Sequence, residues 1–137
     1  MANTKQTGDV TESRILHELV RRGHSVSVPF GDNDPYDLVV SVGDRLVRVQ
    51  CKTGWREDGR VRFKTGSKTT DDGEPVVVDY GDAVDVFAVR CRDSDTLYWV
   101  PADETGRKST YLRVEPPEID HPAVRRASDY VFDRRLP

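Results

Sequence analysis

The sequence has few of the features that commit a chain to a membrane, to secretion or to a disulfide framework. Its 137 residues contain no apolar run near the roughly 20 residues that a membrane span needs. The first residues, Met-Ala-Asn-Thr-Lys-Gln, hold no apolar signal core. Only two cysteines are present, Cys51 and Cys91, and both fall in apolar, strand-like segments. We therefore expect reduced core thiols, a cytoplasmic location and no membrane partner.

Several well-known catalytic motifs are absent as well. The sequence contains no G-x-G-x-x-G, no G-x-x-x-x-G-K-[ST], no G-x-S-x-G and no C-x-x-C. Its three histidines, His17, His24 and His121, lack the spacing of metal ligands, and no histidine is placed as a base for a serine or cysteine nucleophile. The sequence therefore favours neither a nucleotide-binding loop nor nucleophilic catalysis.

Charge is distributed unevenly along the chain. The net charge is −3, while aspartate outnumbers glutamate and arginine outnumbers lysine, a bias that resembles proteins from a high-salt cytoplasm. Residues 52–68 nevertheless carry a local surplus of four positive charges, which we call the basic rim. Such a rim suits a phosphate backbone, and a solvated loop and hairpin is the alternative. Its cations are Lys52, Arg56, Arg60, Arg62, Lys64 and Lys68, against Glu57 and Asp58.

The residue pattern predicts a helix near the start of the chain. Residues 1–8 are polar and predicted to lie outside the fold. Asp9 or Thr11 can cap a helix that runs to about Arg22, and Gly23 would end it. The apolar stripe of this helix is Ile15, Leu16, Leu19 and Val20.

The rest of the chain consists mainly of predicted strands. They cover residues 25–28, 38–42, 45–52, 61–64, 84–89, 97–100 and 111–114, the last as an edge strand. Residues 65–75 are predicted to form a loop, and residues 122–130 a final helix. This order predicts an α/β or α+β fold with a mixed β-sheet core flanked by helices. The length predicts one domain, 1–137, with residues 1–8 and about 115–137 peripheral.

A central hairpin brings polar side chains together. Gly43-Asp44 reads as a two-residue turn, so Val42 pairs with Arg45. Counting outward, Asp37 falls opposite Gln50, and Lys52 lies diagonal to Asp37 on the same face. The other face is almost wholly apolar, and a one-residue slip would mix the two sets. Its apolar residues are Leu38, Val40, Val42, Val47, Val49 and Cys51.

This polar face has a chemical interpretation. A carboxylate with neutral oxygen ligands suits Mg²⁺, and a nearby lysine suits an anionic substrate or an attacking water. Glu12 lies one turn before the apolar stripe of the helix and is placed to face the sheet. The alternatives are a surface ion pair between Asp37 and Lys52 and, for Glu12, a helix-start glutamate with no further role.

These residues resemble the PD-(D/E)XK nuclease superfamily. The resemblance lies in Glu12 on the first helix, Pro35-Tyr36-Asp37 at the start of a strand and Gln50-Cys51-Lys52 on the next strand. The chain is most similar to the branch related to group I intron-encoded homing endonucleases, over roughly residues 5–101. The segments that carry this closer likeness are residues 8–12, 36–38, 49–54, 85–89 and 98–101.

The resemblance implies a mixed four-stranded sheet flanked by helices and hydrolysis of DNA phosphodiesters with Mg²⁺ or Mn²⁺. Asp37 would bind the metal, and Glu12 would complete the site from the helix. Lys52 would orient or activate the attacking water. Gln50 stands where most members carry a second acidic residue, which leaves two negative ligands and predicts weaker metal affinity. Arg56, Arg60, Arg62, Lys64 and Lys68 would contact DNA.

Three functional hypotheses stay open. The first is a metal-dependent DNA endonuclease, which includes a Holliday-junction or repair nuclease. The second is a catalytically inactive nucleic-acid-binding domain of the same fold, and the third is a structural or interaction domain. For an endonuclease we expect a homo-oligomer, a dimer or a tetramer, because one small domain cuts only one strand per site.

Overall fold

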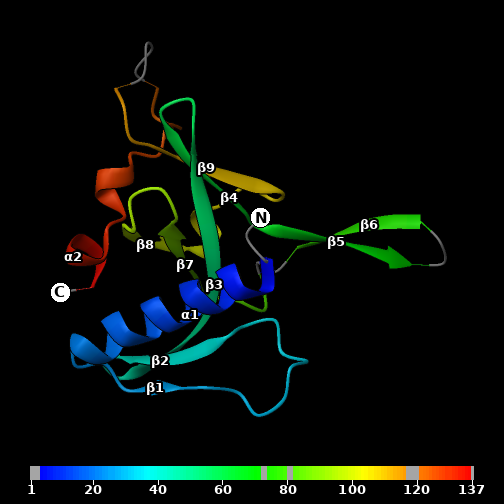
Figure 1. The fold of residues 1–137 in the computed structure, drawn as a ribbon, viewed down its shortest axis with the longest axis vertical. Helices are drawn as coiled ribbons and strands as arrows, with labels where there is room; N and C mark the ends of the chain where they lie inside the picture. The colour runs from blue at the N-terminus through cyan, green and yellow to red at the C-terminus, as the bar shows by residue number, and fades with distance from the viewer. Residues whose placement is uncertain (1–3, 72–73, 80–81, 117–120, 137) are drawn as a thin grey trace.

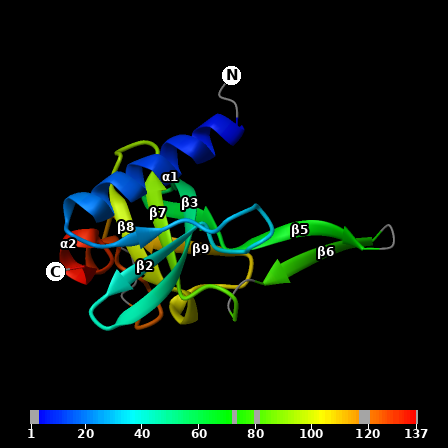
Figure 2. The same ribbon diagram turned by 90° about the horizontal axis from the view of Figure 1, so that it is seen from below.

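A long first helix opens the fold and lies across one face of a β-sheet (Figures 1 and 2). The computed structural model describes residues 4–71, 74–79, 82–116 and 121–136, with the backbone alone described for 67–71 and 74–79. Helix α1 spans Thr4–Arg21, so the prediction that residues 1–8 lie outside the fold is wrong for residues 4–8. No helix among the described residues is long and apolar enough to cross a membrane.

The end of α1 is the one predicted. Gly23 has a φ of 91°, which an L side chain rarely adopts. Its N–H donates to the carbonyl of Val20, and the N–H of His24 donates to the carbonyl of Leu19, each at 3.0 Å, which is the Schellman pattern. Ile15 and Leu19 of the predicted stripe are fully buried, but Val20 is 56% exposed, so its inclusion in that stripe was wrong.

Seven strands form a mixed sheet around the long strand β3. Strands β1, β2, β3, β4 and β9 lie side by side and antiparallel, with β9 at the predicted edge. Strand β7 runs parallel to β3 and pairs antiparallel with β8, which confirms a mixed sheet. The strands are β1 (Val26–Ser27), β2 (Leu38–Val42), β3 (Arg45–Glu57), β4 (Arg60–Lys64), β7 (Val86–Cys91), β8 (Leu97–Pro101) and β9 (Ser109–Arg113).

Strand β3 belongs to two parts of this sheet. Its residues 49–54 pair with β7, and its residues 55–57 pair with β4. At the branch, a Cβ on Gly54 would lie 3.0 Å from Cγ1 of both Val61 and Val89, so glycine allows both neighbours to approach. The predicted strand over 45–52 is therefore too short, because β3 continues to a two-residue turn at Asp58-Gly59.

The two faces of the sheet bury two apolar clusters. The helix-side cluster packs Ile15 and Leu19 of α1 against β2, β3, β7 and β8. The second cluster, on the other face, is built around Phe63, Phe87 and Val89. All six apolar residues of the predicted hairpin face lie in or against the helix-side cluster, which confirms the predicted register: Leu38, Val40, Val42, Val47, Val49 and Cys51.

A second, two-stranded sheet projects from the body of the protein (Figures 1 and 2). It consists of β5 (Gly66–Asp71) and β6 (Glu74–Asp79), paired antiparallel. The prediction of a loop over residues 65–75 is therefore wrong. The polar, glycine-containing sequence of residues 65–73 resembles a loop.

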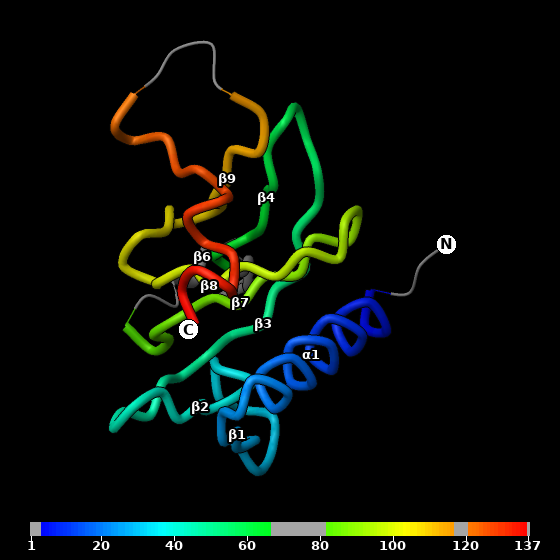
Figure 3. Tube along the Cα trace, turned by 90° about the vertical axis from the view of Figure 1, so that its left-hand side faces the viewer, coloured from blue at the N-terminus to red at the C-terminus, as the bar shows by residue number. Residues whose placement is uncertain are grey.

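Residues 121–136, which we call the C-terminal segment, run beside β9 and then along β8 (Figure 3). It contains the 3-10 turn η2 (Ala127–Asp129) and the short helix α2 (Phe132–Arg135), and a further 3-10 turn, η1 (Ala102–Glu104), follows β8. The predicted helix over 122–130 is thus wrong. So is the prediction that residues 115–137 are peripheral, because Tyr130 joins the second cluster and Phe132 joins the helix-side cluster.

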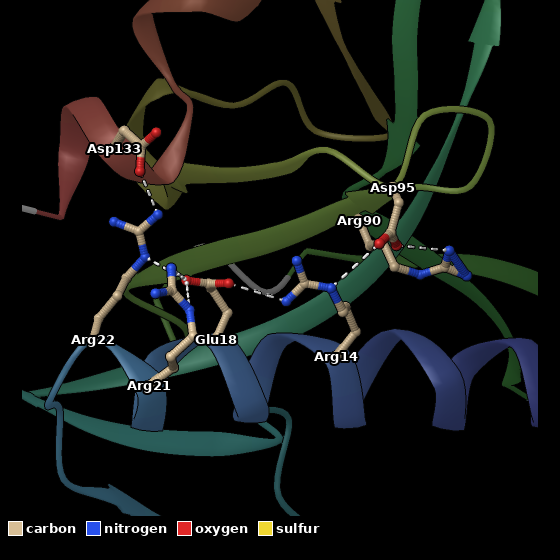
Figure 4. Close-up of polar contacts among 7 residues, drawn as sticks. All are labelled: Arg14, Glu18, Arg21, Arg22, Arg90, Asp95 and Asp133. Atoms are coloured by element: carbon tan, nitrogen blue, oxygen red, sulfur yellow. Dashed lines mark hydrogen bonds and ion pairs between the residues drawn. The ribbon is translucent and has the colours of Figure 1, made fainter.

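A buried carboxylate ties α1 to the rest of the fold (Figure 4). Glu18 is 6% exposed and accepts hydrogen bonds from three arginines, two in α1 and one directly after it, which lower its pKa to about 2. Arg14 also contacts Asp95 after β7, and Arg22 contacts Asp133 in α2. The three arginines are Arg14, Arg21 and Arg22.

Candidate active site

Asp37 directly precedes β2 and is held against β3. Its N–H donates to the carbonyl of Val49, and its Oδ2 accepts a hydrogen bond from the N–H of Cys51, both at 2.8 Å. The observed pairs, from Val42 with Arg45 to Leu38 with Val49, place Asp37 opposite Gln50 as predicted. The hairpin therefore fixes both the position and the orientation of this carboxylate.

Glu12 approaches Asp37 from α1. Burial raises the pKa of Glu12, and the negative charges of Asp37 and Asp9 raise it further. Burial also raises the pKa of Asp37, while the Cys51 N–H and the charge of Lys52 act in the opposite direction. The charge of Asp37 thus disfavours the charged form of Glu12, although the two residues are 25 positions apart in the sequence.

Lys52 provides positive charge on the same side of the hairpin. It is partly buried, and burial lowers its pKa. The charge of Asp37 raises the pKa of Lys52, and the charge of Lys64 lowers it again. An ammonium group that is partly desolvated beside a carboxylate interacts more strongly with a bound anion than one in bulk water.

Gln50 contributes a side-chain amide oxygen to the candidate site. Its Oε1 is buried and has no hydrogen-bond partner. Leaving a buried amide oxygen unpaired costs free energy, which a cation at that point would recover.

Glu12, Asp37 and Gln50 therefore offer two carboxylates and one amide oxygen, a hard-oxygen donor set that fits a divalent cation such as Mg²⁺. Over the part of the chain that the structure describes, no group of three or more His, Cys, Asp or Glu side chains forms a metal site. Any metal held here would depend on the neutral Gln50 as its third protein ligand.

A hydroxyl pair joins the helix to the strand beside these residues. Thr11 Oγ1 lies 2.6 Å from Thr53 Oγ1, and Arg90 Nε donates to Thr11 Oγ1 at 3.2 Å. Thr11 is 1% exposed and directly precedes Glu12, while Thr53 directly follows Lys52. Sequence reasoning missed this pair, although the adjacency of each threonine to a candidate residue was a visible signal.

Cys51 is a core residue, as predicted from the register. Its side chain packs against the helix-side cluster, and burial raises the pKa of its thiol, with Asp37 and Glu12 adding to the effect. Both cysteines are free thiols. The protonated thiol favours a structural over a nucleophilic role.

The basic rim is divided between two surfaces. In the sheet, Arg62 of β4 lies between Trp55 of β3 and Tyr111 of β9. Because side chains alternate along a strand, Arg60, Arg62 and Lys64 share the outward face of β4. Arg56 pairs with Val61, on the other side, and contacts Glu115 at 3.7 Å. The side chain of Lys68 lies outside the described residues.

Comparison with protein-family models places this architecture in a known family. The model of the PD-(D/E)XK endonuclease family matches residues 2–133. The chain therefore belongs to the PD-(D/E)XK endonuclease family, and the resemblance inferred from the sequence is confirmed. Nucleases of this family generally use divalent metal ions. A search of curated proteins gives no match.

One solved structure shares the fold, and a second aligns more weakly. The bacterial homing endonuclease I-Ssp6803I aligns over 98% of this chain and 93% of its own, with a TM-score of 0.79 and 24% sequence identity. Hjc, a Holliday junction resolvase from the archaeal hyperthermophile Archaeoglobus fulgidus, aligns over 78% of this chain and 84% of its own, with a TM-score of 0.49 and 13% identity. The first likeness confirms the predicted mixed β-sheet core flanked by helices and shows that the fold is restriction-endonuclease-like.

Proposed function

We propose that the protein is a Mg²⁺-dependent DNA endonuclease, with Mn²⁺ as an alternative cation, and that Glu12, Asp37, Gln50 and Lys52 form its active site. The observation that carries the proposal is the buried, unpartnered Oε1 of Gln50 beside two carboxylates whose pKa values are raised. An endonuclease family supplies the reaction class.

Each residue has a defined task. The Cys51 N–H orients Asp37, and Glu12 adds the second negative charge from α1. Gln50 adds a neutral oxygen donor. A divalent cation bound to these oxygens would polarise the scissile phosphate and lower the pKa of its water.

Lys52 stabilises the negative charge that develops on the phosphate, because it is held near Asp37 in a partly desolvated position. Little covalent chemistry is required of the protein, so positioning and charge account for most of the rate enhancement. Glu12, Asp37 and Lys52 are therefore expected to act as one unit.

DNA is the proposed substrate. The structurally similar I-Ssp6803I is a homing endonuclease, and Arg60, Arg62 and Lys64 offer an outward-facing set of cations near the same strand. We expect the active form to be a dimer or tetramer, because cutting both strands needs two sites.

The test is nicking of supercoiled plasmid in Mg²⁺, followed by addition of EDTA, at low and at high KCl. The wild-type protein should nick the plasmid and EDTA should stop it, while Asp37→Asn should lose more than 100-fold of the activity, on the order of the loss of one central electrostatic group. Asp44→Asn, an exposed aspartate at the far end of the same hairpin, is the matched control and should cleave normally.

Asp37→Asn should also fold. Burial raises the pKa of Asp37, so the negative charge of this residue does not stabilise the folded protein. Its amide oxygen can still accept from the Cys51 N–H. Thermal unfolding without metal should give a Tm equal to or above that of the wild type. Full metal-dependent cleavage by a folded Asp37→Asn protein would contradict the assignment.

One observation favours a second candidate, a DNA-binding domain without catalysis. The site holds two carboxylates and a neutral amide, and no triad of acidic, cysteine or histidine ligands occurs among the described residues. This candidate predicts DNA binding with no nicking at any Mg²⁺ or Mn²⁺ concentration, and the plasmid assay separates the two.

A further inference from the structure

The outward face of the β4–β9 arm is an ordered arginine surface. Val61, Phe63 and Leu112 are buried in the second cluster, so the alternate residues of β4 and β9 face outward. Arg60 lies over the ring of Tyr111 at 4.0 Å, and the Nε of Arg60 is covered and makes no hydrogen bond. Stacking on an aromatic ring therefore holds this guanidinium in place.

The C-terminal segment adds further arginines beside this face. The backbone N–H of Arg113 in β9 donates to the backbone carbonyl of Arg125 at 2.6 Å, and Arg113 forms a parallel β-bridge with Arg126. A hollow of about 200 Å³ results, and Arg60, Arg113 and Arg125 all line it together with Tyr111.

A second hollow of about 400 Å³ adjoins the first, since Val124 and Arg125 line both. It extends along the C-terminal segment to Arg134 and Arg135 of α2. We call the surface formed by both hollows the arginine groove. Its arginines are Arg60, Arg113, Arg125, Arg126, Arg134 and Arg135.

Two carboxylates offset part of the charge of the six groove arginines. Asp129 is the one acidic residue among the described residues that line the groove, and its Oδ1 is 3.9 Å from Nε of Arg134. Glu104 does not line either hollow, but its Oε2 lies 3.7 Å from Nη1 of Arg135 and its Oε1 accepts a hydrogen bond from the Tyr130 hydroxyl. Arg113 and Arg125 donate from Nε to backbone carbonyls, of Glu115 and Glu104 respectively, which leaves the formal charge of each guanidinium in place.

A groove of guanidinium groups selects phosphate. Planar guanidinium donors match phosphate oxygens in pairs, and they keep their charge at any physiological pH. The arginines come from β4, β9 and the C-terminal segment and cover two adjoining hollows, which suits a chain of phosphates better than a single anion. The protein as a whole carries a net charge of −3, so a polyanion would be attracted to this surface specifically.

We propose that the arginine groove binds the phosphate backbone of the DNA substrate at a second position, outside the Glu12–Asp37–Gln50–Lys52 site. The proposal rests on the proposed function for its choice of DNA. The proposal adds the C-terminal segment to the substrate-binding surface. Contacts to phosphates would position the DNA whatever its base sequence.

The test measures DNA binding in EDTA, where no cleavage occurs, by fluorescence anisotropy of a labelled duplex several helical turns long. The groove variant is Arg125→Gln with Arg134→Gln, and the matched control is Arg45→Gln with Arg107→Gln, two exposed arginines outside the groove and the site. Each phosphate contact contributes about 0.9 to the slope of log K against log salt. We expect the groove variant to bind about 3–10-fold more weakly, with a slope shallower by about 1–2, and the control to match the wild type.

Thermal unfolding checks that the double variant folds. If the double variant does not fold, Arg134→Gln alone replaces it, because the Arg134 side chain is 69% exposed. The single variant should show about half of the change in the salt slope. Equal affinities and slopes for groove variant and control overturn the proposal. A groove variant that changes the oligomeric state without DNA, but not DNA affinity, overturns it in favour of contact with an acidic surface of a second copy.

Failure of the groove and failure of the nuclease assignment are distinguishable. Wild-type cleavage with an unaffected groove variant removes the groove alone. Weakened binding by the groove variant, with no cleavage by the wild type in Mg²⁺ or Mn²⁺, supports the groove and removes the nuclease assignment. A wild-type protein that binds no duplex DNA overturns the groove as well.

Discussion

Gln50 places a neutral amide where two carboxylates already lie close together, and its buried Oε1 is left without a partner. Replacing it with glutamate adds a third negative charge to the same face. Gln50→Glu should therefore lower the Tm of the metal-free protein and raise its affinity for Mn²⁺ about tenfold, because affinity rises with ligand charge.

Isothermal calorimetry with Mn²⁺ and thermal unfolding with and without the metal measure both effects. The matched control is Gln6→Glu, which adds the same charge at an exposed position of α1. If Gln50→Glu and Gln6→Glu bind Mn²⁺ with the same affinity as the wild type, Gln50 is not a ligand.

At the residue scale, the sequence predicts the positions that depend on local geometry. A two-residue turn sets the register of the hairpin, so the positions of Asp37, Gln50 and Lys52 relative to one another follow from counting. The contact between Thr11 and Thr53 does not follow, because it depends on where α1 crosses β3. No local pattern encodes that crossing.

At the scale of elements, the Thr11–Thr53 hydroxyl pair connects the helix of Glu12 to the strand of Lys52. Removing the Thr11 hydroxyl leaves the partly buried hydroxyl of Thr53 without this partner and releases the constraint on Glu12. Thr11→Val should reduce kcat about tenfold with little change in KM, because a small misplacement costs this much or more.

Plasmid cleavage kinetics and Mn²⁺ affinity test this positioning role. Thr11→Ser, which keeps the hydroxyl, should restore most of the activity. Ser13→Ala removes an exposed hydroxyl two residues further along α1 and serves as the control. Equal losses in Thr11→Val and Thr11→Ser would point to packing and not to the hydrogen bond.

The arginines around Glu18 make the attachment of α1 dependent on pH. The pKa of Glu18 is lowered from about 4.5 to about 2, so its stabilising effect is complete above pH 4.5 and is lost as the pH falls toward 2. Glu18→Gln should destabilise the protein by about 2 kcal/mol at pH 7, as expected for hydrogen bonds to a charged group.

The difference between Glu18→Gln and the wild type should shrink between about pH 4.5 and pH 2, as urea unfolding at several pH values would show. Glu57→Gln is the control, because Glu57 is 38% exposed and its pair with Arg62 at 3.4 Å is a surface contact. A pH-independent effect of Glu18→Gln would assign the loss to packing.

Elements with strong apolar alternation were predicted well, and elements without it were not. The hairpin of β2 with β3 forms in the predicted register, and β7 and β8 lie close to their predicted positions, because each strand contributes buried apolar residues. Strand β5 of the second sheet has a polar, glycine-containing sequence that resembles a loop. The turn at Asp58-Gly59 carried a recognisable hairpin signal that would have extended β3.

At the scale of the whole molecule, the C-terminal segment completes the core. The ring of Phe132 lies 5.7 Å from that of Trp99 in an edge-to-face arrangement, and Phe132 is 2% exposed. Phe132→Ala should destabilise the protein by about 3–4 kcal/mol, as for other buried aromatic residues. Urea unfolding measures this, with Val20→Ala as the control, since Val20 is 56% exposed.

A small effect of Phe132→Ala, within about 0.5 kcal/mol of Val20→Ala, would mean that the C-terminal segment is dispensable for stability. The sequence did not predict its contribution, because Tyr130 and Phe132 sit in a short segment with no clear period. Their burial depends on β8 lying beside them, through the hydrogen bond from the Trp99 N–H to the Tyr130 carbonyl at 2.7 Å.

The two halves of strand β3 belong to different parts of the molecule. Its inner half carries Gln50 and Lys52, and its outer half carries Trp55 at the base of the β4–β9 arm. If the proposed function holds, variation in the outer half would change which nucleic acids are bound without altering the groups proposed to perform hydrolysis. An experimenter who wishes to redirect this scaffold to new targets would randomise the arm and leave the inner half of the strand untouched.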